Sequence, residues 1–99
     1  MAQLPLIYAP HLDNIVRQEL QKKPDLKDAY KLLEKSIVKN PKQASIEDFI
    51  LNNGRVVRCY KKTAYAVSFS RSMPYSKNEI IILYEILDTE IRVVNVLFP

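Results

Sequence analysis

Two stretches in the first half of the chain carry apolar residues at helical spacing. Residues 11–23 form the first of them, and the residues that share one side of the expected helix are Leu12, Ile15, Val16, Glu19 and Leu20. Apolar residues three or four apart line one face of an α-helix. Two lysines follow beside the negative end of the helix dipole, and Pro24 cannot continue the helix. The pattern predicts a helix from about His11 to Lys23.

The second periodic stretch begins near Asp25, where acidic residues at 25 and 28 favour a helix N-terminus. Its apolar stripe consists of Leu26, Ala29, Tyr30, Leu33 and Ile37. It ends at Asn40-Pro41, because a residue before proline is biased away from the helical region. Only a few residues join the two helices, so we expect an antiparallel helical hairpin.

The remaining apolar runs are too short for helices or alternate with polar residues. Before the helices, Leu4–Tyr8 predicts a short strand that ends at Pro10. After them, Ser45–Asp48 is expected to start one helical turn that brings Phe49 and Ile50 onto the core. Asn52-Asn53-Gly54 is a turn signal.

The second half of the chain reads as sheet. The predicted strands are Val56–Tyr60, Tyr65–Phe69, Ile80–Ile86 and Ile91–Phe98; the predicted connections are a hairpin at Lys61–Thr63, a loop at Met73–Asn78 and a turn at Asp88–Glu90. Together the patterns predict one α+β domain over residues 1–99. In it, an N-terminal strand and a two-helix hairpin pack on a small, mainly antiparallel sheet of four or five strands.

Composition narrows the possible chemistry. The 99 residues suffice for one core, and the single glycine leaves no Gly-rich phosphate loop. One cysteine and one histidine offer no disulfide and no metal-ligand spacing, so we expect no metal, no cofactor and no small-molecule substrate. No apolar run is long enough to span a bilayer, and the first ten residues lack the basic segment of a signal peptide. The expected compartment is a reducing cytoplasm, with no membrane partner.

Charge is placed unevenly along the chain. The net charge is +4, and residues 54–78 hold six Lys or Arg and no acid. Tyrosines at positions 60, 65 and 75 lie among these cations. Cations that neutralise phosphates and aromatic rings that stack on bases are the features of an RNA-binding surface. Lysines on the edge of a small sheet also prevent aggregation, which is the alternative interpretation. Period-two alternation allows only part of the set to form a single patch.

The order of elements resembles a known family. A β-α-α-β-β-β layout in a basic chain of this length resembles the RelE/ParE toxin superfamily of type II toxin–antitoxin systems. The stretch IIILYEILDTEIRVVNVL is similar to the paired C-terminal strands of that family. The segment DNIVRQELQKKPDLKDAYKLLEKSIVKNP is similar to its helical hairpin in placement and in the terminal Asn-Pro.

The resemblance implies a toxin that arrests growth and is neutralised by a cognate antitoxin protein. Members act by ribosome-dependent cleavage of mRNA, as metal-independent endoribonucleases that use Lys, Arg and Tyr, or by acting on DNA gyrase. By this resemblance the candidate catalytic residues are Arg55, Arg58, Arg71 and Lys77. The candidate residues for binding nucleic acid or the antitoxin are Lys61, Lys62, Tyr65, Tyr75 and Arg92.

The sequence departs from the nuclease pattern at three strand positions. Aligned through Tyr65 and Tyr84, the family's lysines correspond to Ala66 and Ser68, and its arginine corresponds to Ile81. These replacements favour a ParE-like member, or a member that keeps only its antitoxin groove. The alternative from another class is a non-catalytic module that binds RNA or protein.

Overall fold

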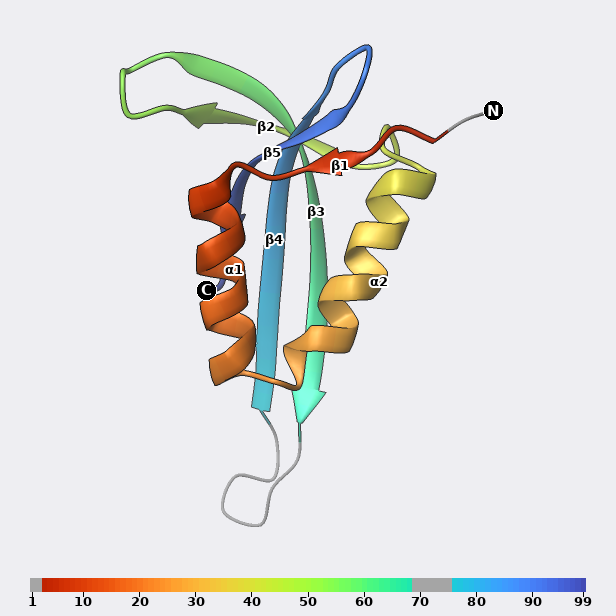
Figure 1. The fold of residues 1–99 in the computed structure, drawn as a ribbon, viewed down its shortest axis with the longest axis vertical. Coiled ribbons are helices and arrows are strands. Elements are labelled where there is room, and N and C mark those ends of the chain that lie inside the picture. Colours follow the sequence, from red (N-terminus) through yellow and green to blue (C-terminus); the bar gives the residue numbers. More distant parts are fainter. Residues whose placement is uncertain (1–2, 69–75) are drawn as a thin grey trace.

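Two helices lie against one face of a five-stranded sheet (Figure 1). The structure is a computed structural model, and it describes residues 3–68 and 76–99. The elements in chain order are β1 (Leu6–Ile7), α1 (Pro10–Lys22), α2 (Leu26–Lys39), β2 (Ser45–Ile50), β3 (Val56–Ser68), β4 (Ser76–Ile86) and β5 (Ile91–Leu97). The predicted α+β class and the helical hairpin are therefore confirmed.

The helices begin and end where proline and the apolar stripes set their limits. Pro10 occupies the first turn of α1, where its missing N–H costs no helical hydrogen bond. The helix ends at Lys22, two residues before Pro24, and α2 ends at Lys39, before Asn40-Pro41. The predicted stripe of α2 faces the sheet, with Leu26 and Ile37 fully buried. In α1, Leu12 and Val16 are buried, whereas Ile15 is half exposed.

The sheet is mixed, and its strand order is β1-β5-β4-β3-β2. β1 pairs with β5 in parallel, and the other three pairings are antiparallel. A register shift between Leu83 and Tyr84 interrupts the β4–β5 ladder. The prediction of four or five strands, mainly antiparallel, is confirmed, and the parallel edge pair is an addition to it.

The predicted hairpin at Lys61–Thr63 is wrong. β3 continues without interruption from Val56 to Ser68, and all three residues of the predicted break pair with β4. None of them is Gly, Pro, Asn or Asp, so the segment has no residue that favours a turn. Residues 76–78, predicted as loop, belong to β4. Phe69 and residues 73–75, parts of a predicted strand and of the predicted loop, lie outside the described residues.

The predicted helical turn at Ser45–Asp48 is also wrong. These residues belong to β2, which pairs along its whole length with β3. Phe49 is half-buried, but Ile50 is 66% exposed and does not reach the core. The segment is a strand because it pairs with β3, which follows it in the chain, and the short segment alone does not reveal that pairing.

The main core lies between the helices and the sheet. Its buried members are Leu12, Val16, Leu26, Tyr30, Leu33, Ile37, Ala66, Ile80, Ile82, Tyr84, Ile91, Val93 and Val96. On β3 the core face is the one that carries Tyr60, Ala64 and Ala66. Because neighbouring strand residues point to opposite faces, Val57 and Cys59 face away from the helices.

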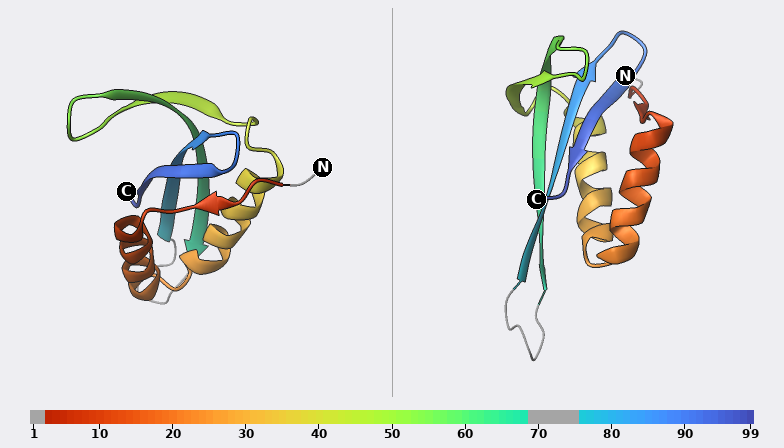
Figure 2. Two further views of the ribbon diagram at one scale, coloured as in Figure 1. Left: turned by 45° about the horizontal axis from the view of Figure 1, so that its top comes forward. Right: turned by 90° about the vertical axis from the view of Figure 1, so that its left-hand side faces the viewer.

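The sheet face opposite the helices holds a smaller apolar cluster. Cys59 and Leu83 are 1% and 4% exposed although no helix covers this face (Figure 2). A cleft lined by residues of α1, β2 and β5, including His11, Phe49 and Asn95, shows that the β2–β3 hairpin approaches the first turn of α1. β3 therefore bends, and the β2–β3 hairpin covers part of the sheet face opposite the helices.

Candidate functional site

The basic residues of β3 do not share one face. Arg58 and Lys62 are an even number of residues apart, and both project from the face that carries the helices. Lys61 and Tyr65 project from the opposite face. The structure therefore brings Arg58 and Lys62 onto one side and Lys61 and Tyr65 onto the other.

Acidic side chains of β2 lie beside two of these cations. Asp48 is the cross-strand partner of Arg58, and its Oδ1 lies 3.4 Å from the guanidinium Nε. Glu47 Oε2 lies 3.1 Å from Lys61 Nζ. The charge that is one-signed along the sequence is thus partly neutralised in space, because β2 supplies the acids that β3 lacks.

Lys62 contacts the end of α2. Its ammonium donates hydrogen bonds to the backbone carbonyl and to the hydroxyl of Ser36, each 2.9 Å long. A cation beside the last turn of a helix interacts favourably with the helix dipole. Here Lys62 shares the Ser36 carbonyl with the backbone N–H of Asn40. Burial lowers the pKa of this ammonium. The position of Lys62 fits a structural role that fastens α2 to the sheet.

Arg92 lies on β5, separated from β3 by β4. Its guanidinium lies 3.9 Å from a Glu85 carboxylate oxygen and 3.4 Å from a Glu90 carboxylate oxygen. By register it shares the open face of the sheet with Lys61. Two strands of that face therefore carry one cation each, and each cation has an acidic neighbour.

The other predicted site residues are placed as follows. Arg55 is exposed in the turn before β3, where its backbone N–H donates to Asn53 Oδ1. Tyr65 is 51% exposed. Lys77 belongs to β4 and pairs with Val67, but its side chain lies outside the described set. Arg71 and Tyr75 lie outside the described residues. Their predicted roles stay predictions.

A partly buried polar cluster joins the segment before α1 to α2, and no pattern in the sequence indicated it. The hydroxyl of Tyr8 bonds to that of Tyr30, and it donates to the Glu34 carboxylate at 2.9 Å. Burial, as the largest cause, raises the pKa of both phenols above their usual range. Residues 22 or 26 positions apart cannot be paired from spacing alone. The cluster fixes the entry of α1 against α2.

Two further side chains of the core region have shifted protonation equilibria. Burial, together with the nearby Tyr60, raises the pKa of the Tyr84 phenol to about 12, and its hydroxyl donates to the Pro41 carbonyl at 2.6 Å. Burial, followed by nearby carboxylates, raises the pKa of the Cys59 thiol. A raised thiol pKa disfavours the reactive thiolate, which agrees with a packing role for Cys59.

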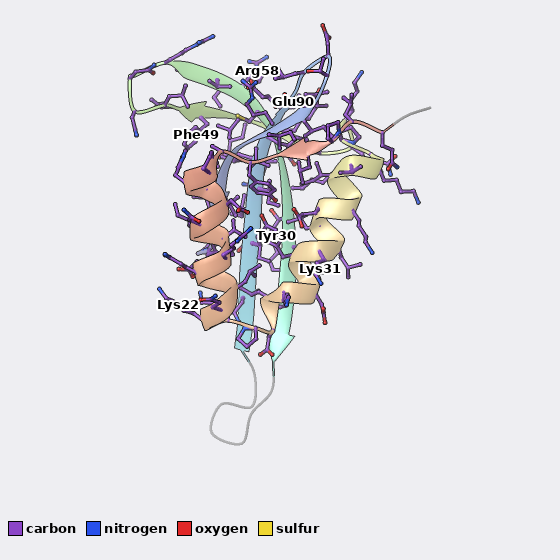
Figure 3. All side chains as sticks on the ribbon, in the orientation of Figure 1. Lys22, Tyr30, Lys31, Phe49, Arg58 and Glu90 are labelled. Carbon is purple, nitrogen blue, oxygen red and sulfur yellow. The ribbon has the colours of Figure 1, made fainter. Side chains whose placement is uncertain are left out.

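The β2–β3 hairpin carries exposed apolar side chains, among them Ile50, which the sequence predicted to reach the core. Ile46, Ile50 and Val56 are each more than half exposed, and all three project from the helix-bearing face. The hairpin extends beyond the ends of both helices, so neither helix covers them (Figure 1). Arg58 lies at the same end of the sheet (Figure 3). We name the set of Ile46, Ile50, Val56, Arg58 and Tyr60 the hairpin surface.

Two negative findings complete the geometry. In residues 3–68 and 76–99, no group of three or more His, Cys, Asp or Glu side chains is placed to hold a metal ion. No helix in the same ranges has both the length and the apolar character needed to cross a membrane.

The fold and the site define an α+β protein with a helical hairpin on one face of a mixed sheet and an exposed apolar hairpin at one end. No family model, curated protein or solved structure matches this chain.

Proposed function

We propose that the protein is the toxin of a type II toxin–antitoxin pair, that it acts by binding a protein target such as DNA gyrase, and that a cognate antitoxin neutralises it. The order of elements supports the proposal, because a short strand, a helical hairpin and a run of antiparallel strands follow one another as the sequence resemblance implies. The resemblance between IIILYEILDTEIRVVNVL and the family's paired strands agrees with β4 and β5, which pair with each other.

The observation that favours protein binding over RNA cleavage is the distribution of cations. Arg58 and Lys61 lie on opposite faces of β3, and each has a carboxylate neighbour on β2. Cleavage of RNA by Lys and Arg requires cations that converge on one phosphate. The exposed isoleucines of the hairpin surface supply instead what a protein interface uses, namely apolar side chains that contact solvent in the free protein.

The alternative function is a non-catalytic RNA-binding module. It is supported by the net charge of +4 and by the exposed position of Arg55. Binding through several phosphates weakens steeply and log-linearly with salt. Protein recognition through apolar contacts has a much smaller salt dependence, so a salt titration separates the two functions.

Inducible expression in bacteria, with and without the neighbouring reading frames, tests the proposal. We expect growth arrest, relief of the arrest by a small acidic protein encoded next door, and inhibition of gyrase supercoiling by the purified protein. Cellular mRNA should stay intact. Normal growth at full expression would refute the toxin proposal, and ribosome-dependent cleavage of mRNA would replace gyrase with RNA as the target.

A further inference from the structure

The hairpin surface contains an apolar row that is interrupted in its middle by the Asp48–Arg58 pair. Ile50 pairs directly with Val56, and Ile46 pairs directly with Tyr60. Cross-strand partners lie on the same face with their side chains in contact distance. Ile46 and Ile50 are 62% and 66% exposed, which is high for isoleucines in paired strands. The row thus exposes apolar area at a place where the protein has no covering helix.

A hollow lies within this surface and gives it a specific shape. It has a volume of about 250 Å³ and is lined by Ile46, Arg58, Cys59 and Tyr60. Tyr60 is held in place because its ring stacks on Tyr84 at a centroid distance of 5.7 Å. An apolar side chain that enters the hollow would contact Ile46 and Tyr60, and a neighbouring carboxylate would meet the guanidinium of Arg58.

Arg58 is available for such a carboxylate. Its side chain is 76% exposed, and its ion pair with Asp48 is 3.4 Å long and open to solvent. Exposed ion pairs contribute little free energy, so exchange of one carboxylate for another is easy. On the face of the hairpin surface, Arg58 and Lys62 stand against the single acid Asp48, and Arg55 is exposed in the turn beside it; this excess of positive charge favours an acidic occupant.

A second copy of the chain fits this surface poorly. β2 is an edge strand, and an antiparallel pairing with its own copy that brings Ile46 opposite Ile50 also sets Asp48 opposite Asp48. Like charges directly opposite each other on neighbouring strands are destabilising. The pattern of β2 thus opposes self-association of the edge.

From these observations we propose that the hairpin surface docks an acidic segment of a partner protein, with a large apolar side chain in the hollow and a carboxylate on Arg58. This inference rests on the proposed function in one respect, since it assigns to the neutralising antitoxin the place where it binds. The chemistry of the surface defines the segment: apolar residues separated by Asp or Glu.

A nuclear magnetic resonance titration tests the proposal. The probes are a soluble synthetic peptide in which Leu residues are separated by Glu, its counterpart with Lys in place of Glu, and oligouridylate RNA. We expect the Glu peptide to shift the amide signals of Ile46, Ile50, Val56 and Arg58, and the Lys peptide and the RNA to leave them in place. Ile50→Ser and Arg58→Glu should each weaken binding of the Glu peptide about tenfold, because each removes a central contact of the interface.

The control variants lie on α2. Leu32→Ser changes a leucine with the same exposed fraction, 66%, as Ile50, and Lys31→Glu reverses an exposed cation on the outer side of that helix (Figure 3). Both should bind the Glu peptide like the unchanged protein, and thermal melting should show that all four variants fold. Equal binding of the Lys peptide, RNA shifts at the same residues, concentration-dependent self-association through β2, or equal losses in the α2 controls would each overturn the proposal.

The docking site and the toxin function fail in different ways. If the Glu peptide maps to the hairpin surface while expression leaves growth normal, the docking site stands and the toxin function falls. If growth arrest and its relief by the antitoxin survive in Ile50→Ser and Arg58→Glu, and the peptide shifts other residues, the toxin function stands and the docking site falls.

Discussion

Buried tyrosines connect distant parts of this small protein. Tyr84 reaches from the middle of the sheet to the Pro41 carbonyl, just after α2, and Tyr8 reaches from the start of α1 to Tyr30 and Glu34. A buried hydroxyl must find a partner, because leaving it without one costs about 1–3 kcal/mol. Each of these phenols therefore fixes two elements relative to one another and forms its bond only in the neutral form.

The protein should lose stability at high pH for this reason. The pKa of Tyr84 is raised from 10.0 to about 12 in the folded state, and those of Tyr8 and Tyr30 are raised as well. Above the ordinary tyrosine pKa the unfolded chain releases these protons first, so the free energy of unfolding falls as pH rises from about 10 towards about 12. Chemical denaturation at a series of pH values measures it.

The variant for this experiment is Tyr84→Phe. It should flatten the fall, because a phenylalanine has no proton to release. A stability that stays constant over this pH range would contradict the prediction.

At the scale of elements, the apolar pattern sufficed where apolar residues recur regularly. Both helices, β5 and the part of β4 from Ile80 to Ile86 follow from apolar spacing bounded by Pro24, Pro41 and the Asp88–Glu90 turn. β2 and the full length of β3 do not, because polar residues interrupt their apolar pattern and only the pairing with neighbouring strands shows that they are extended. Because Lys61–Thr63 are polar, β3 looks like two separate strands until its pairing with β2 and β4 is known.

The candidate site shows the same limit. The sequence revealed the excess of cations in residues 54–78, but the face of each cation depends on strand register, and its ionic partner depends on which strand lies next to it. Asp48 and Arg58 are ten residues apart and meet only because β2 pairs with β3. The sequence also did not reveal that Ile46 and Ile50 are exposed, because isoleucines in a strand are ordinarily buried.

The turn between β2 and β3 gives a prediction at this scale. Gly54 has φ of +84°, a conformation that side chains with a Cβ disfavour, and an added Cβ would meet no atom within 4 Å. The cost of Gly54→Ala is therefore backbone strain alone, about 1–2 kcal/mol. Gly54→Asn should cost less, since asparagine tolerates this region. Urea denaturation checks both, with Asn52→Ala as control; an unchanged midpoint for Gly54→Ala would contradict this account.

At the scale of the whole molecule, stability should decrease from the centre of the sheet to its edges. β3 and β4 are long and pair with a strand on each side, and β4 holds four buried side chains, whereas β1 contributes two residues and β2 has one free edge. Amides that open only on global unfolding exchange slowest. We expect the slowest hydrogen exchange in β4 and the core-facing half of β3, and the fastest strand exchange in β1 and β2.

Mass spectrometry of exchanged peptides measures this order. Protection of β2 equal to that of β4 in the free protein would contradict it. Addition of a segment that docks on the hairpin surface should slow exchange in β2 specifically, which links this measurement to the peptide titration.

The parallel pairing of β1 with β5 has a consequence for folding during synthesis on the ribosome. Leu6 and Ile7 emerge from the exit tunnel long before Ile91 and Arg92, the residues with which they pair. The two helices also lack their sheet until β3 and β4 have been synthesised. Contacts between residues so distant in sequence form slowly and leave apolar surfaces uncovered meanwhile. The nascent chain therefore exposes the sheet-facing sides of its helices until β3 and β4 have been synthesised. The sheet is complete only after β5 has followed, because β1 pairs with β5.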